Sequence, residues 1–79
     1  MNMPLFVDEL TLRDTVSRNI TKLAFDFNLS QADLSRMTGL PQATVSNWML
    51  GKSIPKASAL CKLADCFDVS VYMILGRGA

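Results

Sequence analysis

The residue types that most often carry enzymatic chemistry are scarce in this sequence of 79 residues. It contains no histidine, which removes imidazole acid–base chemistry, His-paired nucleophiles and imidazole metal ligands. The two cysteines, Cys61 and Cys66, are five positions apart, which on a helix places them about 140° from each other. They cannot pair in that geometry, and two thiolates alone make a poor zinc site. We expect buried or half-buried reduced thiols of a cytoplasmic protein.

Other kinds of site are also missing from the sequence. The glycines at 39, 51, 76 and 78 are scattered, so no Gly-rich phosphate loop is present. No stretch approaches about 18 consecutive apolar residues, and the N-terminus lacks a basic region, so neither a membrane span nor a signal peptide is expected. We therefore predict no catalytic residues, no cofactor, no metal, no small-molecule ligand and no enzymatic activity.

Neutral hydrogen-bonding side chains are instead concentrated in one short segment, residues 42–47. The outward-facing residues of its predicted helix are Gln42, Ala43, Thr44, Ser46 and Asn47. Gln and Asn can each form two hydrogen bonds with adenine, and Ala can pack on a thymine methyl group. The segment also lacks a carboxylate, which DNA phosphates would repel. These residue types indicate a surface that lies against nucleic acid.

The elements that must position this segment begin with a long helix. Apolar residues recur at helical spacing, which predicts a helix from about 12 to 27. Its apolar residues are Leu12, Val16, Ile20, Leu23, Ala24 and Phe27. Thr11 followed by Asp14 is the expected cap, and Asn28 is the expected left-handed stop. Residues 1–10 are expected to form an arm in which Leu5, Phe6 and Val7 cover the core, pair as a dimer strand, or stay loose.

Two shorter helices follow. Ser30 with Asp33 predicts the start of a helix over 31–38, which Gly39 ends because glycine adopts positive φ without strain. The next helix is expected over 42–50, and Gly51 ends it. Together they form a helix-turn-helix, in which the second helix enters the DNA major groove. The residues that hold the pair together are predicted to be Leu34, Gly39, Leu40, Val45 and Trp48, with Met49 also facing inward.

The remainder of the chain completes an all-α domain of five helices. A helix from about 56 to 67 carries an apolar stripe, and Ser70 caps a last short helix that Gly76 closes. The stripe consists of Leu60, Leu63, Ala64 and Phe67, and Val71, Ile74 and Leu75 are the apolar residues of the last helix. Residues 11–79 are therefore expected to form one compact domain after the N-terminal arm.

From about residue 19 to residue 76, the sequence resembles the phage repressor and Cro-like helix-turn-helix domains, which include the N-terminal domain of the lambda repressor. The residues that carry the resemblance are Ile20, Leu23, Leu29, Ser30, Gln31, Leu34, Gly39, Leu40, Val45, Ser46, Trp48, Gly51, Lys52, Pro55, Leu60, Leu63, Ala64, Phe67, Val69, Ser70, Val71, Leu75 and Gly76. The resemblance implies a five-helix domain that binds operator DNA as a transcriptional repressor, usually as a symmetric dimer.

The same resemblance implies roles for single residues. Gln42, Ala43 and Asn47 would face bases, while Thr44 and Ser46 would lie at the margin. Gln31, Lys52, Ser53 and Lys56 would contact phosphates. The sequence also departs from the family pattern. Where many members pair an Arg of the first helix with a Glu of the third, this chain has Ala24 and Met49, and Pro41 replaces the usual polar cap.

Charge is unevenly distributed, although the net charge is only +1. Residues 34–64 contain no Asp or Glu, and their four basic residues are Arg36, Lys52, Lys56 and Lys62. Four cations are few for a DNA-binding domain, so we expect affinity for double-stranded operator DNA to depend on a homodimer. The chain is expected at the nucleoid of a bacterial cytoplasm. The alternatives are an antitoxin-type regulator, which binds both an operator and a toxin, and a protein-interaction module without DNA binding.

Overall fold

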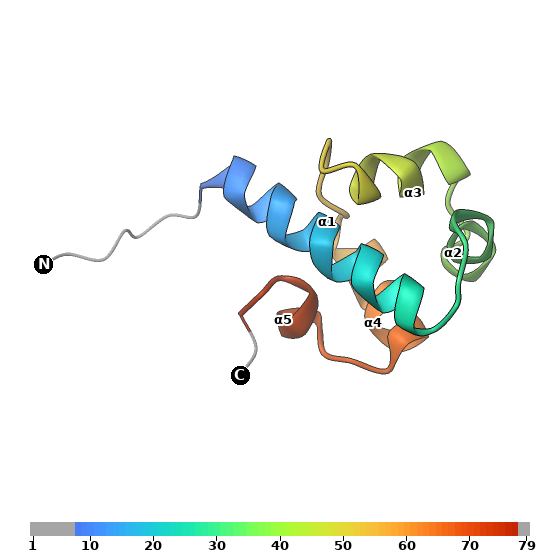
Figure 1. The fold of residues 1–79 in the computed structure, drawn as a ribbon. Coiled ribbons are helices and arrows are strands. Elements are labelled where there is room, and N and C mark those ends of the chain that lie inside the picture. The colour runs from blue at the N-terminus through green and yellow to red at the C-terminus, as the bar shows by residue number, and fades with distance from the viewer. Residues whose placement is uncertain (1–7, 78–79) are drawn as a thin grey trace, which may run out of the picture.

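The computed structural model describes residues 8–77, which form five α-helices and no strand. The helices are α1 (Glu9–Asp26), α2 (Gln31–Thr38), α3 (Gln42–Met49), α4 (Ala57–Phe67) and α5 (Val71–Ile74). Figure 1 shows α1 running along the middle of the molecule, with α2 and α3 at one side and α5 at the other. This is the predicted all-α class.

The long first helix begins three residues earlier than the sequence predicted, and its cap is not Thr11. Asp8 is the N-cap, and its carboxylate accepts hydrogen bonds from the backbone N–H of Leu10 and from the hydroxyl of Thr11. Glu9 then forms an ion pair with Arg13 one turn later, at 2.7 Å. Residues 9 and 10 therefore belong to α1, whereas the expected arm residues 1–7 lie outside the described part of the chain.

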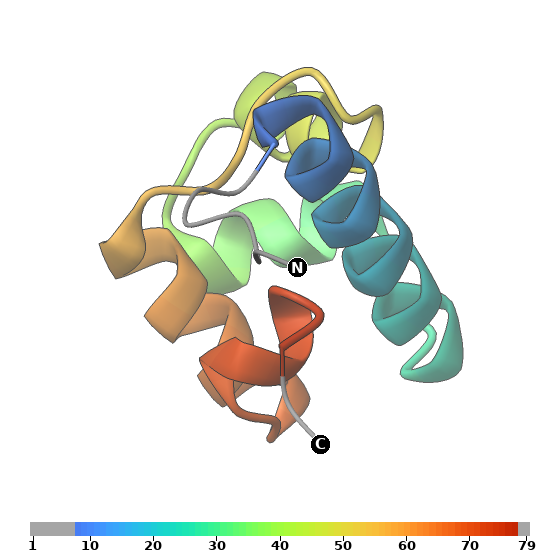
Figure 2. The same ribbon diagram turned by 90° about the vertical axis from the view of Figure 1, so that its left-hand side faces the viewer.

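One core joins all five helices, and it contains most residues of the predicted apolar stripes. Its buried members are Val16, Ile20, Ala24, Leu34, Val45, Trp48, Ala59, Leu60, Leu63, Ala64, Phe67 and Ile74. Complete burial of one of its Val, Leu, Ile or Phe side chains contributes about 1.5–3 kcal/mol to folding. In Figure 2 α1 runs down the right-hand side of the molecule, α4 lies at the left and α5 at the bottom, with α2 between them. Within the core, α3 packs against α1 and α2, and α2 packs against α4.

Phe27 and Cys61 differ from the predicted burial, whereas Met49 packs against the core as predicted. Phe27 lies just after α1 and is 48% exposed, although its ring packs edge-on against Phe67 with centroids 5.8 Å apart. Met49 is half-buried because it lies in the last turn of α3, at the edge of the core. Cys61 was expected to be at least half-buried, but it is exposed on the outer face of α4, whereas Cys66 is half-buried.

The turns follow the predicted chemistry at most helix ends. Ser30 and Asp33 form a complete capping box at the start of α2, and Gly39 ends that helix with φ 76°. Asn28 adopts φ 56°, as expected for a left-handed stop, while the left-handed Asp68 that ends α4 was not anticipated. Among residues 8–77, no helix combines the length and the apolar character that crossing a membrane requires.

Candidate nucleic-acid interface

The helix-turn-helix places one face of α3 in the core and leaves the opposite face at the surface. Leu34 of α2 and Val45 of α3 are fully buried, and Trp48 is 2% exposed. Leu40 is half-buried at the angle between the two helices, next to the exposed Gly39. Leu34, Val45 and Trp48 therefore lie in the core, whereas Leu40 and Gly39 lie in the turn between the helices. The two buried residues of α3 determine which of its faces points outward.

The outward face of α3 carries a strip of neutral side chains, most of them polar. Gln42, Ala43 and Asn47 are exposed, and Ser46 is half-buried. Residues four apart on a helix lie above one another, so Gln42 aligns with Ser46 and Ala43 with Asn47. We call these four residues the α3 strip. Its two amide side chains, Gln42 and Asn47, are five positions apart and belong to these two neighbouring rows, and no charged group lies among the four residues.

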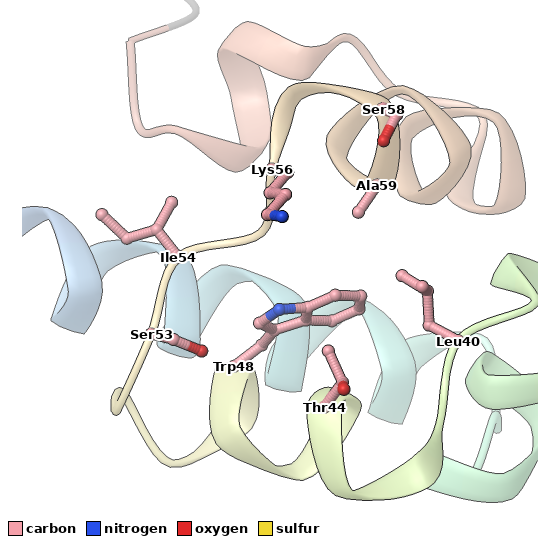
Figure 3. A pocket seen from close by; sticks show the side chains of 8 residues that line it. All are labelled: Leu40, Thr44, Trp48, Ser53, Ile54, Lys56, Ser58 and Ala59. Carbon is pink, nitrogen blue, oxygen red and sulfur yellow. The ribbon is translucent and has the colours of Figure 1, made fainter.

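Thr44 lies away from the α3 strip, on the side of α3 that faces α4. It is half-buried and lines a cavity of about 400 Å³, together with Leu40 and Trp48. Figure 3 shows this cavity between α3 and the beginning of α4, with the Thr44 side chain directed toward the gap. Of the side chains predicted for the interface, Thr44 is thus the one on α3 that the fold turns toward α4.

The predicted phosphate contacts lie on the connection that follows α3 and at the start of α2. Lys52 and Lys56 are exposed, and Ser53 is half-buried between them. Figure 3 shows the side chains of Ser53 and Lys56 at the rim of the cavity beside Trp48. Gln31 is the first residue of α2 and is half-buried. No ion pair within residues 8–77 involves either lysine.

The two other cations of residues 34–64 have partners inside the fold. Arg36 pairs with Asp33 one turn earlier on α2. Lys62 reaches from α4 and donates a hydrogen bond from its Nζ to the carbonyl oxygen of Thr38, at 3.1 Å. Lys62 therefore holds the end of α2, where carbonyl groups lack partners within the helix. Of the four cations in residues 34–64, those that remain available are Lys52 and Lys56, on the connection between α3 and α4.

Local electrostatics leave the interface without an unpaired carboxylate. The backbone N–H of Ser30 and the guanidinium of Arg36 hold the pKa of Asp33 below its ordinary value, so its charge persists but is paired. Residues 34–64, which follow it, contain no carboxylate. Within the described residues, no group of three or more His, Cys, Asp or Glu side chains gathers as metal ligands would. The surface suits a polyanion rather than a cation.

Two residues that sequence reasoning overlooked also contribute to the site. Ser17 of α1 donates a hydrogen bond to the carbonyl oxygen of Met49, and Ser35 of α2 donates one to the carbonyl oxygen of Leu40. These contacts join residues 32 and five positions apart. Ser35 could have been suspected because a small hydroxyl precedes the turn, but nothing in the sequence near Ser17 indicates its partner.

One face of α3 is buried, a tight turn joins α3 to α2, and the outward face of α3 is uncharged. This arrangement defines a helix-turn-helix DNA-binding protein. Comparison with known proteins agrees. Residues 26–74 match the helix-turn-helix family HTH_3, which covers more than half of the chain, and the chain therefore belongs to this family. It is a DNA-binding transcriptional regulator and not an enzyme. No curated protein sequence matches the chain significantly.

Solved structures share the fold. A hypothetical transcription factor, NHTF from Neisseria, is 25% identical with a TM-score of 0.76, and the match covers 95% of this chain and 86% of that one. An HTH_3 family transcriptional regulator from Vibrio cholerae is 18% identical with a TM-score of 0.77. That match covers 89% of this chain but only 39% of the Vibrio protein, so it shows the fold alone.

Proposed function

We propose that the protein is a Cro-like repressor of phage or prophage type that binds a palindromic operator as a homodimer and blocks a promoter. The observation that carries this proposal is the α3 strip. Its exposed Gln42, Ala43 and Asn47 match the major-groove edges of A·T pairs, and it lies within a segment of 31 residues that contains no carboxylate. In this proposal Gln31, Lys52, Ser53 and Lys56 contact phosphates, with Ser46 at the margin.

The surface of α5 supports the dimer in this proposal. Tyr72 is 68% exposed and Met73 is 51% exposed, and the helix carries no charged residue. Exposed apolar side chains without charges are typical of a protein–protein contact. A second copy bound there would double the number of available cations. Binding to two half-sites would then require the two α3 helices to lie about 34 Å apart, the distance of one DNA turn.

The same face of α5 is the observation that favours a second candidate, an antitoxin-type regulator whose domain binds both DNA and a toxin. The two candidates differ in the occupant of α5. A purified chain that is dimeric at micromolar concentration supports the homodimeric repressor. A chain that is monomeric alone, even at high concentration, favours the antitoxin-type regulator.

Selection of bound duplexes from a random pool tests the proposed function. The purified protein is mixed with random double-stranded DNA, the bound fraction is amplified, and the enriched sequences are aligned. We expect a palindrome whose half-sites are centred about 10 base pairs apart. Enrichment of a single half-site would exclude the symmetric dimer. No binding to any duplex at low salt would instead support a protein-interaction module.

A further inference from the structure

Serine hydroxyls that belong to other helices hold the DNA-reading helix α3 at both ends. At its beginning, Ser35 Oγ of α2 donates to the carbonyl oxygen of Leu40 at 2.5 Å. At its end, Ser17 Oγ of α1 donates to the carbonyl oxygen of Met49 at 2.6 Å. The N-cap of α3 is Pro41, which provides no side-chain cap of its own. The side-chain hydrogen bonds at the two ends of this helix therefore come from α1 and α2.

These two hydrogen bonds constrain α3 in a way that its apolar anchors do not. Burial of Val45 and Trp48 holds α3 against the core. Because the hydrophobic effect is non-directional, this burial alone does not fix the orientation of α3. A hydrogen bond requires a short distance and an aligned donor. With one such bond near each end, both the tilt of α3 and its position along its own axis become defined.

Ser17 and Ser35 lie where these bonds are protected. Both residues are half-buried, so water competes less for the two carbonyl oxygens than it would at an open surface. Ser17 also lies against the chain that leaves α3, since its Cβ is 3.8 Å from the place where a side chain at Gly51 would begin. A change at Ser17 therefore acts on the backbone at the end of α3, and a change at Ser35 acts on the turn that leads into it. Neither serine belongs to the exposed α3 strip.

We propose that Ser17 and Ser35 are positioning residues that determine how strongly the protein distinguishes its operator from random DNA. This inference rests on the proposed operator binding. Hydrogen bonds to base edges fail when a side chain is displaced by a fraction of an ångström, whereas attraction to phosphates changes little over that distance. Loss of either hydroxyl thus weakens binding to the operator and leaves binding to random DNA nearly unchanged.

The test compares the wild type with Ser17→Ala and Ser35→Ala on two duplexes, the selected operator and a scrambled sequence. Dissociation constants are measured at several salt concentrations and at a temperature where every variant is fully folded. The ratio compared is the dissociation constant for the scrambled duplex divided by that for the operator. We expect each alanine variant to lower this ratio by about threefold to tenfold, as the loss of one net hydrogen bond implies. The salt dependence should not change. Ser17→Thr, which retains a hydroxyl, should recover most of the ratio.

Two control variants separate positioning from general stability. Thr21→Ala removes an exposed hydroxyl from α1, and Phe27→Leu weakens the ring contact with Phe67 at the far end of that helix. Both should retain the wild-type ratio, although Phe27→Leu melts at a lower temperature. An unchanged ratio in both serine variants, with a wild type that prefers its operator, overturns this inference alone. A wild type without any sequence preference overturns the proposed function, and this inference with it.

Discussion

At the scale of single residues, the interface separates base contacts from phosphate contacts. The α3 strip is neutral, so its side chains add little to general attraction for DNA but can distinguish bases through paired hydrogen bonds. Lys52 and Lys56 are exposed, and neither forms an ion pair within the described residues. Their effect should be independent of sequence. Substitutions at the two kinds of position should consequently give different binding signatures.

Lys52→Ala should weaken binding to every DNA sequence by a similar factor. Removing one phosphate contact means that one fewer counterion is released, so the slope of log K against log salt should become shallower by about one for each subunit. Binding to the operator and to random duplexes is measured by fluorescence anisotropy between low and moderate salt. A loss confined to the operator would show that Lys52 contacts a base instead.

Asp33 should make the stability of the fold depend on acidic pH. The N–H of Ser30 and the side chain of Arg36 hold the pKa of Asp33 below its ordinary value of 3.8 in the folded protein. Its contribution to the free energy of unfolding is therefore present above that value and is lost as the pH falls through the lowered pKa. The free energy of unfolding of the wild type, measured with urea, should fall as the pH drops through this range. The free energy of unfolding of Asp33→Asn should depend less on pH. Parallel curves for the two proteins would contradict this assignment.

At the scale of the elements, two glycines with the same backbone conformation differ in their surroundings. Gly39 has φ 76° and nothing within 4 Å of an added Cβ, whereas Gly76 has φ 75° and would place a Cβ 2.5 Å from Thr15 Cγ2. Gly39→Ala should cost about 1–2 kcal/mol for the left-handed conformation. Gly76→Ala should cost about 1–3 kcal/mol more, because α5 must move away from α1. Urea unfolding measures both, and equal losses would contradict the close approach of α5.

Helix positions followed well from local signals, because caps and left-handed turns act within a few residues. The bounds of α2 were predicted correctly from Ser30, Asp33 and Gly39, and α3 ends one residue earlier than expected. The start of α1 was predicted too late because Asp8 and Glu9 were taken as part of the arm. Asp8 is the cap and Glu9 the first helical residue.

The candidate site could be predicted only in part, for a related reason. Helical periodicity places Gln42, Ala43 and Asn47 outside and Val45 inside without any knowledge of the remaining structure. The direction of Thr44, and the partners of Ser17 and Lys62, depend instead on how the helices pack together. A hydrogen bond between residues 32 positions apart leaves no local pattern in a single sequence.

At the scale of the whole molecule, the small number of available cations makes pairing of two subunits important. Arg36 and Lys62 are engaged within the fold, which leaves Lys52 and Lys56 on the connection that follows α3. One subunit should therefore bind DNA weakly, and two subunits on a palindrome should bind far more tightly because the second contact becomes intramolecular. This argument agrees with the exposed apolar face of α5.

Tyr72→Lys should convert the proposed dimer into a monomer. The change places a charge on an exposed apolar face, where an interface would bury it, so the dissociation constant of the dimer should rise at least about tenfold. Operator affinity should fall even though the substitution adds a positive charge. Phe25→Lys, at a side chain 84% exposed on α1, is the matched control and should leave both quantities unchanged. Sedimentation equilibrium decides the matter, and an unaltered dimer would place the interface elsewhere.

The most direct test of base reading by the α3 strip combines a protein change with a base-pair change. Affinities of the wild type and Gln42→Ala are measured for the selected operator and for duplexes that differ from it at one base pair in each half-site. For the wild type, replacing the base pair that Gln42 contacts should cost about 1–3 kcal/mol per half-site, and the same replacement should cost Gln42→Ala almost nothing. If Gln42→Ala instead loses affinity equally for the operator, its variants and random DNA, the α3 strip does not read the operator.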